Sequence, residues 1–242
     1  MEISDMESIY MPLRSVPALG EGEVHLWHVR LENLPVMESI LPAEARDRVR
    51  QLRMGQKFML RLLLGAYLEI PGRDVVTVAG KNGKPVLAPP LARSGLAFNL
   101  SHAGDRLAIA VARNLPVGVD IEQVGRDVRW RKLSERWFSR VEAEWLKTLE
   151  SGTANREFLR LWTVREAMIK ALGATIAGHI SGVTPEPGNP AHIRSLPEGW
   201  PESKTWTLHE HERETGLHGW LAVPGPVAAI RTYALVMGED GR

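Results

Sequence analysis

The stretch FLRLWTVREAMIKALG, Phe158–Gly173, predicts a helix, and the rest of the chain is best interpreted from it. Asn155 suits the N-cap, Gly173 suits the C-terminal cap, and strong helix formers lie between them. One apolar face is expected, because apolar residues recur at roughly helical spacing: Phe158, Leu161, Trp162, Ile169 and Leu172. Glu166 and Lys170 are four residues apart and therefore lie on one side of this helix. On their own they indicate no more than a weak surface ion pair.

A second informative tract lies upstream, PVGVDIE at Pro116–Glu122. Its apolar residues alternate with Gly118, Asp120 and Glu122, the period-two pattern of a half-buried strand, so both carboxylates leave the same face. Two like charges this close repel unless a cation or a proton lies between them. Together with Glu166 they form a set of hard oxygen ligands, which favours magnesium, calcium or manganese over zinc. Solvated charges on an exposed strand face are the alternative.

Composition limits the class of protein. A chain of 242 residues forms one large or two small domains with a substantial core. The net charge of +1 gives no reason to expect a nucleic-acid or membrane partner. The absence of cysteine excludes disulfides, thiol catalysis and cysteine-zinc sites. No apolar run is long enough to cross a bilayer and the N-terminus lacks a signal-peptide pattern, so a cytoplasmic protein is expected.

A basic helix is predicted in the first part of the chain, beginning at Leu41-Pro42 and continuing to about Leu68. Its cations recur three or four residues apart and form one stripe: Arg46, Arg50, Arg53, Lys57 and Arg61. Such a stripe is usually the solvated face of an amphipathic helix. Because no acid follows Asp47 in it, the stripe is also a candidate surface for phosphates.

Two short motifs follow this helix. The turn Gly80-Lys81-Asn82-Gly83 places Lys84 before a proline, in an extended conformation, and by itself indicates only a tight turn. A short buried strand over 96–100 is expected to deliver Ser101 and His102 at its end. Their hydroxyl and imidazole groups can bind phosphate there, and a capped turn is the equal alternative.

The remaining elements complete a mixed fold. A strand over Arg106–Arg113 is expected to turn directly into the PVGVDIE tract, which would place the acids on a hairpin. Ser139 and Glu142 predict a capping box that opens a helix over 140–149. The proline- and glycine-rich region 178–203 is expected to be irregular, before strands at 204–212, 219–223 and 231–236. His209 and His211 share a strand face, but no third ligand of matching spacing supports a metal site.

These motifs, in this order, resemble the 4′-phosphopantetheinyl transferase superfamily, in its larger single-chain pseudodimeric branch (the surfactin-synthetase-activating type). The family pattern is a G-V-D-x-E strand, here Gly118–Glu122, and a W-(T/S)-x-K-E-(A/S)-x-x-K helix about forty residues on. Arg165 stands where that helix usually has lysine. Three upstream matches are GKP at Gly83–Pro85, N-L-S-H at Asn99–His102, and R-x-x-x-R at Lys57 and Arg61 with Lys57 conserving the charge. Beyond Gly173 the usual second glycine is replaced by Ala174-Thr175, so the carrier-facing details lie outside the match.

The resemblance implies an enzyme that transfers the 4′-phosphopantetheine group of coenzyme A to a serine hydroxyl of an apo acyl or peptidyl carrier protein, releasing 3′,5′-ADP. Its pathways would be those of polyketides, nonribosomal peptides, lysine or fatty acids. Asp120, Glu122 and Glu166 are expected to hold Mg²⁺, with Mn²⁺ as the other candidate. Glu166, or a water it holds, would be the base, and Lys170 would neutralise the transferring phosphate or protonate the leaving oxygen. The expected coenzyme A binders are Lys84, Ser101 and His102, with Lys57 and Arg61 at its 3′-phosphate end.

The fold implied by the resemblance is α+β, a pseudodimer of two similar halves, each an antiparallel sheet packed against a long helix. The join is placed near Ala112–Pro116, between a coenzyme A-binding half, 1–113, and a metal-binding and catalytic half, 114–242. A monomer is expected, with its active site in the cleft between the halves. Two alternatives remain: another carboxylate-metal phosphohydrolase or nuclease, and a non-catalytic carrier-binding module.

Overall fold

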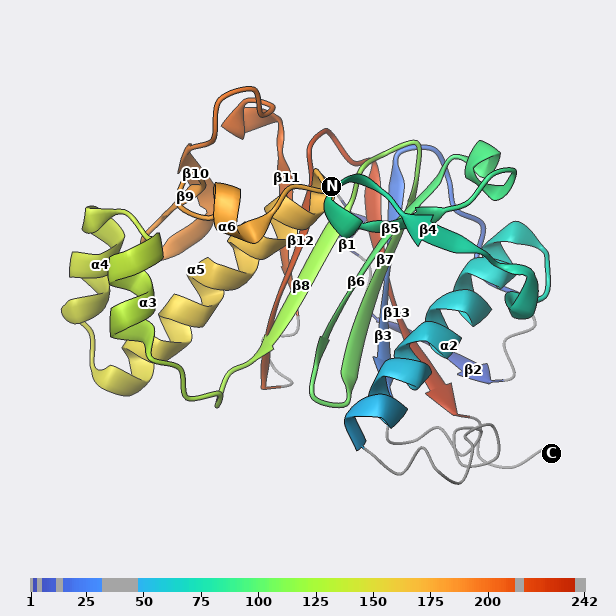
Figure 1. The fold of residues 1–242 in the computed structure, drawn as a ribbon, viewed down its shortest axis with the longest axis horizontal. Coiled ribbons are helices and arrows are strands. Elements are labelled where there is room, and N and C mark those ends of the chain that lie inside the picture. Colours follow the sequence, from blue (N-terminus) through green and yellow to red (C-terminus); the bar gives the residue numbers. More distant parts are fainter. Residues whose placement is uncertain (1, 4–5, 12–14, 32–47, 212–215, 238–242) are drawn as a thin grey trace.

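The computed structural model describes residues 2–3, 6–11, 15–31, 48–211 and 216–237, which form a mixed α+β fold. Figure 1 shows two long helices, α2 (Arg48–Leu68) and α5 (Ser151–Ala171), on opposite sides of the strands. The predicted beginning of the basic helix at Leu41-Pro42, and Arg46 with it, lies outside the described residues. Among the residues described, no helix is long and apolar enough to cross a membrane.

The larger sheet has six strands. Its path is β1 (Glu2–Ile3), β13 (Ala229–Met237), β3 (Glu23–Arg30), β7 (Arg106–Arg113) and β6 (Leu96–Ala103), with β2 (Glu7–Met11) also paired to β13. The pairs β3–β7 and β7–β6 are antiparallel, but β13 runs parallel to β3, and β1 and β2 run parallel to β13. This sheet is therefore mixed rather than purely antiparallel, because the end of the chain returns to it.

The smaller sheet consists of β11 (Thr207–His211), β12 (Leu217–Val223) and β8 (Gly118–Gln123), all antiparallel. The prediction that β7 and β8 form a hairpin is wrong, because β8 pairs with β12 instead. Strand β8 nevertheless runs beside β6, where the backbone N–H of Val119 donates a hydrogen bond of 2.8 Å to Asn99 Oδ1. A side chain thus bridges two edge strands that belong to different sheets.

Of the four hydrophobic cores in the described part of the chain, three hold the layers together. One lies between α2 and the larger sheet and includes Trp27, Leu63 and Tyr233. The second lies between the two sheets, where the apolar positions Val117, Val119 and Ile121 meet a row of alanines on β7: Ala108, Ala110 and Ala112. The third lies between α5 and the opposite face of the smaller sheet. The period-two prediction for β8 is confirmed, but its polar face is covered by α5 rather than by solvent.

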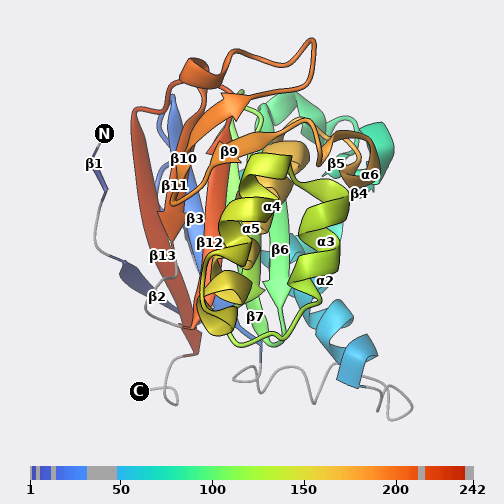
Figure 2. The ribbon, with the colours of Figure 1, turned by 90° about the vertical axis from the view of Figure 1, so that its left-hand side faces the viewer.

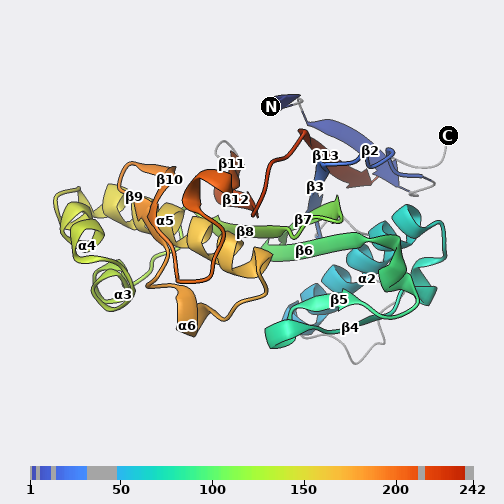
Figure 3. The same cartoon turned by 90° about the horizontal axis from the view of Figure 1, so that it is seen from above.

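Smaller elements surround α5. Helices α3 (Trp130–Trp137) and α4 (Arg140–Lys147) pack with it, as Figure 2 shows, and the predicted capping box at Ser139 and Glu142 is confirmed. The region expected to be irregular contains α6 (Ile176–His179) and the hairpin β9 (Thr184–Glu186)–β10 (Asn189–Ser195). A further hairpin, β4 (Thr77–Ala79)–β5 (Pro85–Leu87), lies beside α2 in Figure 3.

Candidate active site

Helix α5 and strand β8 approach each other as closely as backbones allow. A Cβ atom at Gly118 would lie 2.0 Å from the carbonyl oxygen of Ala167, so only glycine fits here. Two residues further along the same face, Asp120 is only 3% exposed. The close contact therefore brings the carboxylate of Asp120 underneath the polar side chains of α5.

The predicted helix is confirmed, although it begins earlier than expected. It starts at Ser151, so Asn155 lies inside it and is not its N-cap; the Asn155 side chain instead bonds the backbone at Arg126 and Val128. At the other end Gly173 has φ +59°, and the N–H groups of Gly173 and Ala174 donate to the carbonyls of Lys170 and Ile169. This Schellman cap fixes the last turn, which carries Lys170.

Asp120 of β8 meets two side chains from other elements at its Oδ1 atom. Lys170 Nζ, from α5, lies 2.5 Å from this oxygen, and Ser101 Oγ, from β6, donates to it at 2.7 Å. Lys170 also donates to Ser101 Oγ at 3.2 Å. Strand β6 continues to Ala103, so Ser101 and His102 lie within the strand rather than at its end. The structure thus brings the predicted phosphate-binding serine to the predicted acid and lysine.

The second oxygen of the Asp120 carboxylate differs from the first in its surroundings. Oδ2 is buried and accepts no hydrogen bond from any described residue. A buried carboxylate oxygen without a donor is costly, and such sites are commonly completed by a cation or by ordered water. The pattern is consistent with a hard cation near Asp120.

Glu166 lies one turn before Lys170 and is held by two neighbours. The indole N–H of Trp162 donates to Glu166 Oε1 at 2.6 Å, and Lys170 Nζ lies 3.6 Å from Oε2. Burial, together with the negative charge of Asp120, raises the pKa of Glu166 to about 7. Burial alone would lower the pKa of Lys170, but the charges of Asp120 and Glu166 outweigh it and raise that pKa. A carboxyl group near its pKa at neutral pH stands beside a fully charged lysine.

Glu122 is engaged by a cation of the loop that follows its strand. Arg126 Nη1 donates to both carboxylate oxygens of Glu122, at 2.7 and 2.8 Å. Within the described part of the chain, no three His, Asp or Glu side chains are arranged as a ready metal site. The three predicted acids have the right donor chemistry for Mg²⁺, and in this arrangement Lys170 and Arg126 neutralise two of them.

The remaining predicted binders differ in their surroundings. His102 is exposed, and partial burial with the positive charges of Lys170 and Arg53 lowers its pKa. Lys57 is exposed on α2, whereas the guanidinium of Arg61 donates to the carbonyls of Gly72 and Arg73. For all of these, contact with coenzyme A stays a prediction.

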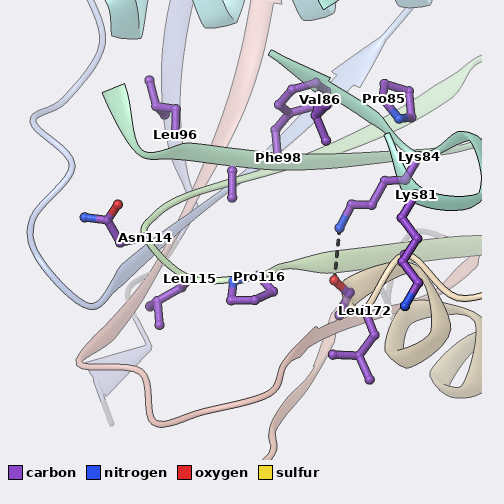
Figure 4. A pocket seen from close by; sticks show the side chains of 13 residues that line it. Lys81, Lys84, Pro85, Val86, Leu96, Phe98, Asn114, Leu115, Pro116 and Leu172 are labelled. Atoms are coloured by element: carbon purple, nitrogen blue, oxygen red, sulfur yellow. Dashed lines mark hydrogen bonds between the residues drawn. The ribbon is translucent and has the colours of Figure 1, made fainter. Parts of the chain in front are cut away.

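Lys84, in the connection between β4 and β5, reaches the residue before β8 and the end of α5. Its ammonium donates to the carbonyls of Val117 at 3.0 Å and Ala171 at 3.1 Å. It forms one wall of a cavity of about 390 Å³ that is lined mainly by apolar side chains of β5, of β6, of the connection between β7 and β8 and of the end of α5, among them Phe98, Pro116 and Leu172 (Figure 4).

Arg165, where the family usually has lysine, points away from this site. It is fully buried, donates to the carbonyls of Val183 and Leu161, pairs with Glu142 of α4, and lies over the ring of Phe138. Its role is to join α5 to its neighbours.

Sequence reasoning missed the residues that orient this site. Trp162 was expected only in the apolar face, although its spacing of four from Glu166 is the signal for their contact. Arg126 is likewise four residues from Glu122. The bridging role of Asn99 had no local signal, because it depends on two strands meeting in the fold.

Comparisons with known proteins agree on one family. The family described as the 4′-phosphopantetheinyl transferase superfamily matches residues 116–216. The 4′-phosphopantetheinyl transferase HetI of Nostoc sp. is 28% identical over 233 residues, which cover 91% of this chain and 95% of that protein. A putative 4′-phosphopantetheinyl transferase of Synechocystis sp. is 31% identical over 182 residues, covering 74% of this chain and 72% of that protein. The 4′-phosphopantetheinyl transferase AcpT of Escherichia coli is 30% identical over 135 residues, 56% of this chain and 67% of that protein.

Proposed function

Because the chain belongs to the 4′-phosphopantetheinyl transferase superfamily, we propose that it moves the 4′-phosphopantetheine group of coenzyme A onto a serine hydroxyl of an apo acyl or peptidyl carrier protein. The observation that carries the proposal is the meeting of Ser101, Asp120 and Lys170 from three elements, with Glu166 one helical turn away. A buried acid, a lysine and a hydroxyl at one point suit phosphoryl transfer, which depends mainly on positioning and on neutralising charge.

The reaction exchanges a phosphoanhydride bond of coenzyme A for a phosphate ester bond to serine. The serine oxygen of the carrier bonds to the phosphorus next to the pantetheine, and the bond from that phosphorus to the oxygen shared with 3′,5′-ADP breaks. Glu166, or a water it holds, takes the proton of the serine hydroxyl, which its raised pKa near 7 supports. Lys170 stabilises the charge of the transferring phosphate or protonates the leaving oxygen, and Ser101 and His102 bind the diphosphate.

Asp120, Glu122 and Glu166 would hold Mg²⁺ or Mn²⁺, which when bound polarises the diphosphate and offsets the charge of the leaving group. The Oδ2 atom of Asp120, which is buried and has no hydrogen-bond partner among the described residues, supports this assignment. Arg126 neutralises Glu122 in the arrangement described above, so metal binding and the Arg126 ion pair compete for the same carboxylate.

The two long helices support a further proposal, that the chain is a pseudodimer of two similar halves. Residues 1–113 would supply α2 with most of the larger sheet, and residues 114–242 would supply α5 with the smaller sheet. In this division β13 crosses over from the second half to pair with β3 of the first. A monomeric state, a cytoplasmic location and the absence of nucleic-acid or membrane partners stay predictions.

The test is intact-protein mass spectrometry of apo acyl and peptidyl carrier proteins after incubation with this protein, coenzyme A and Mg²⁺. We expect the carrier to gain one phosphopantetheinyl group, and we expect EDTA to abolish the gain. Coenzyme A binding without transfer to any carrier would favour the non-catalytic binding module. Hydrolysis of coenzyme A or nucleotides without an acceptor would favour a phosphohydrolase.

A further inference from the structure

Strands β6 and β8 meet without forming a common sheet. Each is the last strand of its own sheet, and Figures 1 and 3 show the two side by side. Among the described strand pairs none joins β6 to β8, although edge strands carry N–H and C=O groups that need partners. The directional contacts along this junction therefore come from side chains.

Two side chains of β6 supply such contacts, and they lie two residues apart on one face of the strand. Asn99 Oδ1 accepts a hydrogen bond of 2.8 Å from the Val119 N–H. Ser101 Oγ donates to Asp120 Oδ1 at 2.7 Å. Because Val119 and Asp120 are neighbours, the bond of Asn99 holds the backbone of β8 directly beside the carboxylate that Ser101 contacts.

The rest of the junction is apolar and does not fix a position along the strands. Ala97 and Ala103 of β6 share one hydrophobic core with Val119 of β8. Apolar contact is non-directional, so small methyl groups permit one strand to slide along the other. Asn99 is only 6% exposed at this junction, where a buried amide is costly unless it is bonded. A single buried asparagine fixes the register of coiled coils in the same way, at a cost in stability.

The position of β8 decides where the catalytic groups lie relative to β6. Gly118 packs on α5 without room for a Cβ atom, so β8 and α5 form one closely packed unit that carries Asp120 and Lys170. Ser101 belongs to β6, on the other side of the junction. A slide by one residue would move the unit by about 3.3 Å along β6. Such a slide would break the contact between Ser101 and Asp120.

We propose that Asn99 is a positioning residue, whose bond to the Val119 N–H sets the register of β8 on β6. Through this register it aligns Asp120 and Lys170 with Ser101. The proposal rests on the proposed transferase activity for its kinetic readout. Amide exchange supplies a second readout that needs neither activity nor metal.

The test compares Asn99→Leu, which removes the acceptor, with Asn99→Asp, which keeps an acceptor oxygen at the same atom. The matched control is Thr207→Val on β11, which removes a side-chain bond of the same length, 2.8 Å, to the carbonyl of Gly225. Transfer is measured with an apo carrier protein, coenzyme A and Mg²⁺. Asn99→Ala replaces Asn99→Leu in every readout if the larger side chain prevents folding.

We expect Asn99→Leu to lower kcat by about ten- to a hundredfold, the range for small misplacements of reacting groups. The KM for coenzyme A should change less than kcat, because the misplaced groups act mainly on the transition state. Asn99→Asp should retain most of kcat, and Thr207→Val should keep the wild-type value. An equal loss of kcat in Thr207→Val would indicate a general packing effect and overturn the proposal.

A double-mutant cycle with Ser101→Ala separates alignment from an independent effect. If Asn99 acts by aligning β8 with Ser101, Asn99→Leu should lower kcat by a factor at least about threefold smaller in the Ser101→Ala background than in the wild type. Losses that simply multiply would contradict the proposed role.

Amide exchange of the metal-free protein is followed over residues 117–121. We expect faster exchange along this whole segment in Asn99→Leu, wild-type exchange in Asn99→Asp and no change in Thr207→Val. Faster exchange at Val119 alone would show the loss of one bond without a change of register and would overturn the proposal, as would unchanged exchange in Asn99→Leu. If the wild-type protein transfers nothing, the proposed function fails, and the exchange arm still decides the role of Asn99.

Discussion

Helices α2 and α5 are both 21 residues long and both pack on a sheet, yet their polar side chains lie in opposite surroundings. On α2 the cations Arg53, Lys57 and Arg61 are exposed, and only one face of the helix is covered. Helix α5 lies between the smaller sheet and helices α3 and α4, so its Arg165, Glu166 and Lys170 must find partners inside the protein. The spacing of charges is similar in the two helices. The difference is that protein covers the polar face of α5 and solvent covers that of α2, so only the charges of α5 form a site.

The sharpest test of this comparison is Glu166→Gln. Removing the ionisable oxygen of the proposed base should lower kcat by about 10²- to 10⁴-fold, while circular dichroism and coenzyme A binding stay those of the wild type. The rate of carrier modification by mass spectrometry measures the loss. Normal turnover in this variant would remove Glu166 from the catalytic role.

A matched pair of arginine variants compares the helices directly. Arg165→Met leaves the buried Glu142 without its cation and should cost about 3–5 kcal/mol of unfolding free energy. Arg61→Met breaks only exposed bonds to backbone carbonyls and should cost less than about 1.5 kcal/mol. Urea unfolding of both variants measures the difference. Equal losses would mean that burial does not separate the two helices.

The pH dependence of stability gives a third test. Burial and the charge of Asp120 raise the pKa of Glu166 from 4.5 to about 7, so the folded chain binds this proton more tightly than the unfolded chain does. The contribution of the protonated Glu166 to the unfolding free energy of the wild type is therefore full below about pH 4.5 and is lost as the pH rises through about 7. In EDTA, Glu166→Gln should lack this loss and be more stable than the wild type at pH 8, by roughly 1–3 kcal/mol.

Urea unfolding at pH 5 and pH 8 supplies the measurement. The advantage of Glu166→Gln should be small at pH 5 and larger at pH 8. An advantage that shrinks as the pH rises would show that the carboxyl group is not destabilised by burial in the folded protein.

The smallest effect is expected for Trp162→Phe, which keeps an aromatic ring and removes the N–H that holds Glu166 Oε1. A lost hydrogen bond to a charged group corresponds to about 1.5 kcal/mol, so kcat should fall by about tenfold. Trp145→Phe on α4 makes the same chemical change away from the acids and should leave kcat unchanged. Similar losses in both variants would indicate a general packing effect.

The sequence predicted those features whose causes are local. The capping box at Ser139 and Glu142, the strand over Arg106–Arg113 and the C-terminal glycine cap at Gly173 depend on residues within one turn or strand, and all three are confirmed. The acids of β8 and their approach to α5 were also expected, because the period-two and four-residue spacings place them on single faces.

Long-range pairings could not be predicted in this way. The partner of β8 is β12, almost a hundred residues later, and nothing in the PVGVDIE tract distinguishes that partner from the adjacent β7. The same holds for Ser101 and Asn99, whose contacts depend on how β6 and β8 are placed relative to each other. The predicted beginning of α5 was also wrong, because the side chain of Asn155 bonds the backbone of a distant loop at Arg126 instead of capping the helix.

The pairings of β12 and β13 have a consequence for folding during synthesis. The strand that carries Asp120 gains its only described sheet partner from Leu217–Val223, and β3 gains a neighbour from Ala229–Met237. Neither sheet can be completed while the ribosome is still translating the first two hundred or so residues, although domains often fold in order from the N-terminus. Such non-local pairing slows folding and leaves the edges of β3 and β8 open for longer. The nascent chain should therefore become protease-resistant late and in one step, only after β13 has left the exit tunnel.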